Sequence, residues 1–353
     1  MPDTREGLVQ LIEYQAYSCR ELGSPLYGAL LDAAAADAAA GGPVYRVLED
    51  KAGDPDGSAL VLRLMAAVHR LVLRGEAPEL AAFYPSAGGS AAGAGAARVF
   101  LEVVEAQEAW LREDSRRPLQ TNEVGRCAAL VGGFLTLAER SGLPLDAVEV
   151  GASAGFNLRW DHYLYEARGE TWGDPASPVR LCGYNTDAPP PFGVEAEVVR
   201  RRGCDPSPID PSSDEGRVSL LSFVWPDQAA RIRLLKAAME VARRVPVTVE
   251  PSPASAWLPA ALSDRPDAAA TVVYHSIVWQ YMDEDEQGAV TAAIEGAGGR
   301  ATRDAPLAWL RMEPSEDQKI VEVRLRTWPG DEDNLIATSG YHGTSVRWLG
   351  GRP

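Results

Sequence analysis

A glycine-rich turn in the middle of the chain has the residue types and spacing of a ligand-binding loop. Residues 147–150 form an apolar run interrupted by Glu149, and residues 151–155, with the sequence Gly-Ala-Ser-Ala-Gly, follow directly. Glycine lets the backbone adopt positive φ and approach a ligand closely, and the first N–H groups of a following helix are unpaired donors. The pattern predicts a buried strand, a tight turn and a helix start, which together are typical of a nucleotide-binding site.

The turn resembles the opening motif of class I S-adenosylmethionine-dependent methyltransferases, in which an acid stands two places before small residues at alternating positions. Glu149, Gly151, Ser153 and Gly155 match that motif position for position. The resemblance implies that the turn wraps the methionine and ribose parts of the cofactor. We therefore expect S-adenosylmethionine to be bound by Glu149, Gly151, Ala152, Ser153, Gly155 and Asn157, with Arg126 and Asp210 beside them.

Other interpretations of the turn remain open. Residues 151–155 also satisfy the Gly-x-Ser-x-Gly nucleophile elbow, in which Ser153 would attack and His342 with Asp331 or Asp333 would complete a triad. An α/β-hydrolase normally has several strands before its elbow, whereas the preceding 140 residues have helical spacing. The glycine spacing also differs from the dinucleotide fingerprint, and no P-loop lysine follows. A turn that only packs within the sheet is the last alternative.

Two charged residues lie just before the first predicted strand. Glu123 and Arg126 are three residues apart, so on a helix beginning near Thr121 they share one face. Arg126 could hold a carboxylate of the cofactor or substrate, and Glu123 could contact the substrate. The alternative is a helix start capped by Glu123 with an exposed ion pair that contributes little to stability.

An acidic, proline-containing loop follows the turn by about fifty residues. Asp205, Asp210, Asp214 and Glu215 could bind a cationic substrate, the ribose of the cofactor or a metal, or could form a solvated surface. We assign Asp205 to the substrate. No histidine accompanies these acids at ligand spacing, so we expect no metal site.

Ribose recognition in nucleotide-binding folds requires an acid at the end of the second strand. The second predicted strand, residues 179–182, ends in Gly-Tyr-Asn instead of an acid. Asp187 or Asp210 could supply the missing acceptor, and the sequence does not decide between them.

His275 lies in the apolar run of residues 271–279, and the carboxyl end of a central strand is where α/β sheets place their chemistry. We expect His275 to be the general base, because a neutral imidazole accepts a proton from a hydroxyl or an amine. Trp279 and Tyr281 are expected to line the substrate pocket. The alternative is a histidine held by hydrogen bonds in the core.

Helical spacing dominates the first 140 residues. Apolar faces recur in residues 8–12, 61–68, 99–110 and 124–135, separated by segments rich in Gly, Pro and Ala. We expect residues 1–118 to form a helical region that caps the substrate, and residues 119–353 to form the cofactor-binding domain.

Short strand-like runs alternate with helical stretches from residue 145 onward. The expected strands are residues 147–150, 179–182, 197–201, 245–249, 271–278, 307–312 and 320–327, with helices after Asp227 and Asp283. This alternation predicts an α/β fold that is Rossmann-like, as in class I methyltransferases, with a mostly parallel sheet and helices on both faces. The runs 321–325 and 346–349 predict an antiparallel hairpin at the end of the sheet.

Four stretches together resemble one bacterial family. They are residues 120–126 (QTNEVGR), 203–210 (GCDPSPID), 222–228 (SFVWPDQ) and 273–281 (VYHSIVWQY). With these stretches, the chain resembles the family called domain of unknown function 2332, and the resemblance covers nearly all of its 353 residues. The family name implies no substrate, so the methyltransferase assignment depends on the local motif and the order of elements.

Composition limits the partners and the compartment. Lys and Arg total 34 against 50 Asp and Glu, and the formal charge of −16 disfavours nucleic acids and anionic membrane surfaces. No signal peptide or run of about 18 apolar residues occurs. The four cysteines lack metal or redox spacing and are expected to be buried thiols in a reducing cytoplasm.

We therefore expect a cytoplasmic S-adenosylmethionine-dependent methyltransferase that acts on a small molecule. The alternatives are a serine hydrolase and a non-catalytic ligand-binding protein of the same fold. The sequence leaves the oligomeric state open.

Overall fold

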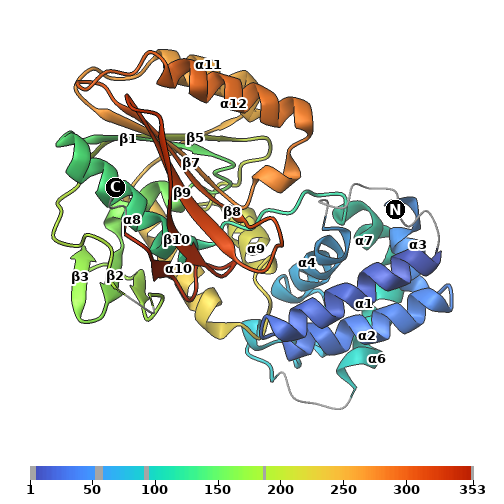
Figure 1. The fold of residues 1–353 in the computed structure, drawn as a ribbon. Coiled ribbons are helices and arrows are strands. Elements are labelled where there is room, and N and C mark those ends of the chain that lie inside the picture. Colours follow the sequence, from blue (N-terminus) through green and yellow to red (C-terminus); the bar gives the residue numbers. More distant parts are fainter. Residues whose placement is uncertain (1–4, 52–58, 91–94, 186–187, 351–353) are drawn as a thin grey trace. The chain divides into compact units, whose positions relative to one another are not determined.

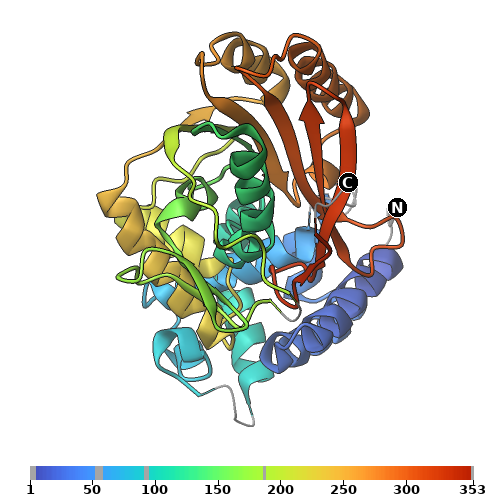
Figure 2. The ribbon, with the colours of Figure 1, turned by 60° about the vertical axis from the view of Figure 1, so that its left-hand side comes forward.

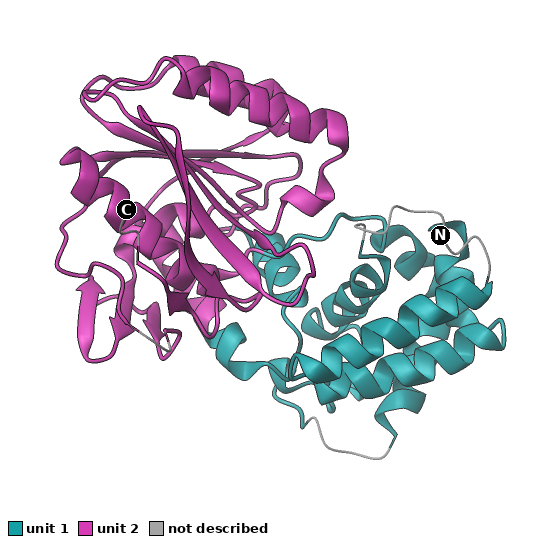
Figure 3. Cartoon of the chain, in the orientation of Figure 1, with its two compact units in different colours: residues 1–121, 213–233 teal, residues 122–212, 234–353 magenta. Residues whose placement is uncertain are grey.

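The computed structural model describes residues 5–51, 59–90, 95–185 and 188–350. The chain divides into two compact units (Figure 3): residues 1–121 with 213–233 are mainly helical, and residues 122–212 with 234–353 are built on a β-sheet. The boundary expected after residue 118 leaves residues 213–233 in the second domain, whereas their contacts assign them to the helical unit.

The helical unit forms from amphipathic segments with clear start signals. Ser24 caps one helix by accepting a hydrogen bond from the Tyr27 N–H, and Pro25 occupies its first turn. Its helices are α1 (Arg5–Glu21), α2 (Pro25–Ala39), α3 (Pro43–Leu48), α4 (Leu60–Leu73), α5 (Pro78–Ala81), α6 (Ala96–Ala106), α7 (Glu108–Asp114) and α9 (Asp214–Ser222), with 3₁₀ turns η1 (Glu49–Lys51) and η3 (Pro85–Ala87). The predicted helical N-terminal region is confirmed.

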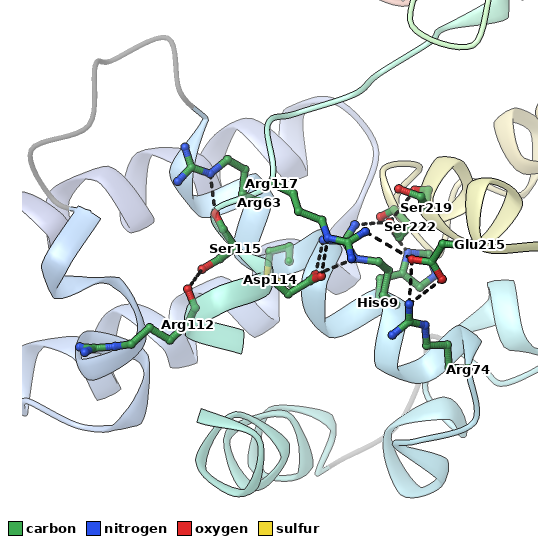
Figure 4. A network of polar contacts seen from close by, with 12 residues as sticks. Arg63, His69, Arg74, Arg112, Asp114, Ser115, Arg117, Glu215, Ser219 and Ser222 are labelled. Carbon is green, nitrogen blue, oxygen red and sulfur yellow. Dashed lines mark hydrogen bonds and ion pairs between the residues drawn. The ribbon is translucent and has the colours of Figure 1, made fainter. Parts of the chain in front are cut away.

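A buried polar network connects three helices of this unit (Figure 4). Arg70 on α4 is 1% exposed; its Nε donates to Asp114 at the end of α7 (2.7 Å), and its Nη1 donates to Ser222 Oγ at the end of α9 (2.8 Å). His69 contacts the Ser222 carbonyl oxygen through Nδ1 (3.2 Å) and Ser86 Oγ through Nε2 (2.7 Å). Residues 213–233 therefore complete the interior of the helical unit.

The second unit contains an eight-stranded sheet with the order β11-β10-β9-β8-β7-β1-β5-β6 (Figure 1). Its strands are β1 (Leu145–Val150), β5 (Val198–Asp205), β6 (Thr248–Pro251), β7 (Ala270–Ser276), β8 (Leu307–Pro314), β9 (Val321–Trp328), β10 (Glu332–Ser339) and β11 (Arg347–Trp348). Strands β6, β5, β1, β7 and β8 are parallel, and β9, β10 and β11 continue the sheet in antiparallel pairs. The prediction of a mostly parallel sheet is confirmed.

Helices cover both faces of this sheet, as expected. α11 (Ala254–Ser263) and α12 (Glu284–Gly298) pack together on one face (Figure 1), where Trp309 joins their apolar cluster. The neighbouring Leu310 points to the opposite face, where a Cβ on Gly133 of α8 (Cys127–Ser141) would lie 2.5 Å from its Cδ1. Figure 2 shows α8, in green, beside the strands that it contacts. α10 (Ala229–Arg244) follows Asp227, where a helix was predicted.

A small second sheet corrects one strand assignment. Its order is β3-β2-β4, with β2 (Leu164–Ala167), β3 (Glu170–Gly173) and β4 (Arg180–Cys182). Residues 179–182 were expected to be the second strand of the main sheet, and that position belongs to β5. Three apolar or β-branched residues indicate a strand but carry no information about which sheet it joins.

The expected hairpin of residues 321–325 and 346–349 is also wrong. β9 pairs with β8 and β10, and β11 pairs with β10. Local pattern does not predict β10, because this strand begins with Glu-Asp-Asn, residues that are depleted in strands.

Candidate functional site

The glycine-rich turn follows the carboxyl end of β1, and its backbone has a conformation that few residues adopt. Gly151 and Gly155 have φ of +69°, and Ser153 has φ of +51°. A positive φ at a non-glycine residue is uncommon and costs conformational free energy, and such residues cluster at functional sites. The turn is also tightly packed: a Cβ on Gly151 would lie 2.5 Å from Val278 Cγ2. Glycine is therefore required here by the fold itself.

The first backbone donors of the turn are bound within the protein. The N–H groups of Gly151 and Ala152 donate to the Cys204 carbonyl oxygen at 2.9 and 3.0 Å. The Ser153 N–H donates to Asp205 Oδ2 at 3.0 Å, and the Gly155 N–H donates to the Ala152 carbonyl oxygen. The N–H groups of Gly151, Ala152 and Ser153 thus fix the loop to the end of β5. The segment after the turn, η5 (Asn157–His162), is a 3₁₀ helix rather than the expected α-helix start.

Asp205, which was expected in an acidic loop and assigned to the substrate, is the acid at the end of the second strand of the main sheet. β5 is the second strand of the main sheet in chain order, and Asp205 is its last residue. The carboxylate is buried, and it accepts hydrogen bonds from the Ser153 N–H through Oδ2 and the Ser207 N–H through Oδ1 (2.8 Å). Asp210 is exposed and accepts from the N–H and Oγ of Ser212. Asp187 lies outside the described residues.

Glu149 faces the interior of the sheet unit. It is 1% exposed, and its Oε2 accepts a hydrogen bond from the Tyr274 hydroxyl at 3.4 Å. Burial raises the pKa of Glu149 well above its ordinary value, and hydrogen bonds from Asn157 and Tyr274 oppose that rise. Asn157 in turn accepts from Cys127 Sγ on α8 (3.3 Å). Glu149 and Asn157 thus support the turn from within the protein.

The segment before α8 touches the turn from another direction. Asn122 Oδ1 accepts from the Phe156 N–H at 2.9 Å, a contact that the sequence analysis did not anticipate. Glu123 caps the 3₁₀ turn η4 (Val124–Arg126) by accepting from the Gly125 N–H. Arg126 is buried, and its Nη1 donates to the Ser276 carbonyl oxygen at the end of β7 (2.8 Å). Arg126 therefore lies at the carboxyl ends of the central strands.

A His–Glu pair stands at the end of β7. His275 is fully buried, and its Nδ1 lies 2.6 Å from Glu313 Oε1 on β8. The same oxygen accepts from the backbone N–H of Val278 (3.1 Å) and of Trp279 (3.4 Å). A carboxylate at Nδ1 fixes the hydrogen there, so the neutral ring presents Nε2 as an acceptor. Among the described residues, Nε2 has no hydrogen-bond partner.

Sequence reasoning missed Glu313. The parallel register pairs His275 with Arg311 and Ser276 with Met312, so Glu313 follows directly beside the end of β7. The predicted strand ended at Met312, the residue before Glu313, whereas β8 continues to Pro314. An acid at the end of a strand adjacent to the histidine strand was the available signal, but strand order was needed to use it.

A cleft of about 430 Å³ opens beside this pair. We call it the tryptophan cleft and define it by His275, Trp279, Trp309 and Glu313, which line it together with residues of α12 and β9. Trp279 stacks on His275 with ring centroids 5.1 Å apart, and Trp309 is tilted against both rings. Tyr281, also expected to line a substrate pocket, is 46% exposed on the 3₁₀ turn η6 (Trp279–Tyr281).

The remaining predicted groups are separated in the fold. Asp214 and Glu215 begin α9 in the helical unit, so the acidic loop is divided between the two units. The Ser153 hydroxyl is buried and has no hydrogen-bond partner among the described residues. Asp331 and Asp333, the acids considered for a triad, pair with Arg326 and Arg311 respectively.

Comparisons with known proteins gave one match. A family model described as "Uncharacterized protein conserved in bacteria (DUF2332)" matches residues 9–348. No curated protein and no solved structure matches the chain. Within the described ranges, no helix is long and apolar enough to cross a membrane.

Proposed function

The chain belongs to the DUF2332 family of bacterial proteins, and we propose that it is an S-adenosylmethionine-dependent methyltransferase with a Rossmann-like cofactor domain that acts on a small molecule. The strand order carries this proposal. Across the sheet, the parallel strands lie in the order β6-β5-β1-β7-β8. Numbered by their order along the chain, this is 3-2-1-4-5, the arrangement of doubly wound nucleotide-binding sheets.

Such sheets bind ligands where the strand order reverses, outside the carboxyl ends of the strands. Here the reversal lies between β1 and β7. The residues that follow these two strands are the glycine-rich turn and the segment 276–279. Ser153 and Ile277, one in each segment, both have positive φ. Strain in both segments at this one edge supports a functional site there.

The residues at this edge fit the cofactor. Asp205 occupies the position from which an acid binds ribose hydroxyls. Its Oδ2 accepts the Ser153 N–H and its Oδ1 accepts the Ser207 N–H, which ties the carboxylate to the glycine-rich turn. Ser153 adds a buried hydroxyl with no partner among the described residues. When bound, S-adenosylmethionine supplies a methyl group activated by its sulfonium.

The contribution of the chain to catalysis is positioning and proton transfer. Arg126, Asn122 and the turn hold the edge of the sheet rigid around the reversal point. His275 Nε2 receives the proton that the acceptor loses, and Glu313 holds the imidazole in the required tautomer.

Titration calorimetry with S-adenosylmethionine and S-adenosylhomocysteine tests the proposal. Asp205→Asn should raise Kd about 10- to 100-fold, because a hydrogen bond to a charged group contributes about 1.5–3 kcal/mol. Asp210→Asn is the matched control and should leave Kd unchanged. Circular dichroism and Tm must show that both variants fold. If the wild-type protein does not bind S-adenosylmethionine, the proposal is contradicted. If only Asp210→Asn loses binding, Asp210 and not Asp205 binds the ribose.

Ser153→Ala separates the hydrolase alternative. It removes a hydroxyl with no partner among the described residues, so the variant should fold. If the protein is a methyltransferase, the Kd of Ser153→Ala for S-adenosylmethionine should stay within a few-fold of the wild-type value. Labelling of the wild type by a fluorophosphonate probe, lost in Ser153→Ala, would favour a serine hydrolase instead.

A further inference from the structure

The arginines that line the tryptophan cleft are already neutralised by acids other than Glu313. Arg311 bonds Asp333 at 2.6 Å; Arg324 contacts Glu322 at 3.3 Å and Asp333 at 3.4 Å; Arg326 contacts Asp331 at 2.6 Å and Glu295 at 2.7 Å. Among the described residues, the basic side chain that contacts Glu313 is His275, whose Nδ1 lies 2.6 Å from Glu313 Oε1. The Glu313 carboxylate is therefore a negative charge in the cleft that no arginine balances.

Two acceptor atoms in this cleft lack partners. His275 Nε2 and Glu313 Oε2 are buried and make no hydrogen bond to any described residue. A buried polar atom without a partner is costly, so each calls for a donor from outside the chain. The antiparallel register also sets Glu313 directly opposite Glu322 on β9. Arg324 lies 3.3 Å from Glu322 and offsets part of this like-charge repulsion, whereas no arginine among the described residues pairs with Glu313.

The walls of the cleft are aromatic. Trp279 and Trp309 have ring centroids 5.8 Å apart and an interplanar angle of 55°, and Trp279 stacks on His275. Indole faces attract organic cations through the ring quadrupole; the Arg311 guanidinium already lies over Trp309, with its central carbon 4.6 Å from the ring centroid, so Trp279 is the indole offered to a ligand. Carboxylate, indole faces and an imidazole nitrogen without a partner together match an ammonium group that carries at least two N–H bonds.

We propose that the tryptophan cleft binds a small organic amine as its ammonium ion and that this amine is the methyl acceptor. The second half of the proposal rests on the proposed function. Glu313 and Trp279 hold the cation, and its N–H groups point to Glu313 Oε2 and His275 Nε2. Trp309 Nε1 and Arg311 Nε are buried donors without partners among the described residues, which suits an oxygen acceptor on the same ligand.

For methyl transfer the ammonium first gives one proton to Glu313 or solvent, which frees the nitrogen lone pair. The lone pair forms the new C–N bond as the C–S bond of the cofactor breaks, and sulfur keeps that electron pair. A proton on the methylated, cationic nitrogen then passes to His275 Nε2, so the product leaves as a neutral N-methylated amine or regains a proton in water.

Binding of three probes of the same shape tests the cleft: benzylamine, benzyl alcohol and benzoate, followed by tryptophan fluorescence and calorimetry at pH 7. We expect benzylammonium to bind at least about tenfold more tightly than benzyl alcohol, which corresponds to about 1.4 kcal/mol. Glu313→Gln should abolish this preference. Glu316→Gln, the same change at an exposed acid outside the cleft, should preserve it. Trp279→Leu keeps the charge of Glu313 and removes an indole, so it should weaken the binding of benzylammonium more than the binding of benzyl alcohol.

Tighter binding of benzoate than of benzylammonium, equal binding of all three probes, or no binding up to their solubility would overturn the cleft assignment. Titration with S-adenosylmethionine in parallel separates the two proposals. Cofactor binding without any preference for the amine leaves the proposed function standing and removes this inference. Amine binding without cofactor binding keeps the ammonium site and removes its role as methyl acceptor.

Discussion

At the scale of single residues, two acids make contacts that the local sequence did not predict. Glu149 matches a ligand-binding motif, yet its carboxyl group lies inside the sheet unit against Tyr274 and Asn157. Asp205 was assigned to the substrate, yet it holds the glycine-rich turn through the Ser153 N–H. Which acid meets a ligand depends on the side of the strand from which its side chain projects.

The raised pKa of Glu149 gives a test at this scale. Between the ordinary pKa of a glutamate and the raised value, the folded protein binds more protons at this site than the unfolded chain does, so stability from this group falls as pH rises. Glu149→Gln removes the titration. We expect the variant to have a higher urea midpoint than wild type at pH 7 and no advantage at pH 4, and the exposed Glu170→Gln to show no such pH-dependent difference. A lower midpoint at pH 7 would mean that the charged carboxylate is required.

At the scale of elements, a buried cation, Arg70, connects helices of the helical unit. Arg70 links α4 to the ends of α7 and α9, where Asp114 and Ser222 accept its hydrogen bonds (Figure 4). Short helices such as α7 gain little stability by themselves, so packing and such contacts hold them.

Asp114→Asn should therefore destabilise the protein by about 3–5 kcal/mol, because it leaves the Arg70 charge buried without its counter-ion. Glu102→Gln breaks the exposed Arg98–Glu102 pair and should change stability by no more than about 0.5 kcal/mol. Urea unfolding followed by circular dichroism measures both. Equal effects of the two substitutions would contradict a special role for the buried pair.

At the scale of the whole molecule, the chain enters the helical unit twice. Residues 213–233 return to it after the first part of the sheet unit has been built. They contribute α9, whose Ser222 contacts both His69 and Arg70. The helical unit is thus continuous in space but not in sequence.

A fragment of residues 1–121 should consequently fail to unfold cooperatively, although it contains seven of the eight α-helices named for this unit. Joining residues 213–233 to it through a flexible linker should restore a cooperative thermal transition. Calorimetry distinguishes these outcomes, and a sharp transition in the shorter fragment would show that α9 is dispensable.

Much of the architecture was predictable from local pattern. Periodicity located the helical region, and apolar runs located β1, β7, β8 and β9 within a few residues. The helix starts after Asp227 and Asp283 were likewise correct, since proline and capping residues act over one helical turn. His275 was placed near a strand end for the same local reason.

What the sequence determined by itself was therefore the type and place of most elements, together with the strained turn that glycine permits. Only the tertiary structure decided which strands are neighbours. Asp205 reaches Ser153 across 52 residues, and Glu313 reaches His275 across 38. Strand order creates these contacts, and it depends on how separate apolar faces pack together, which no local spacing records.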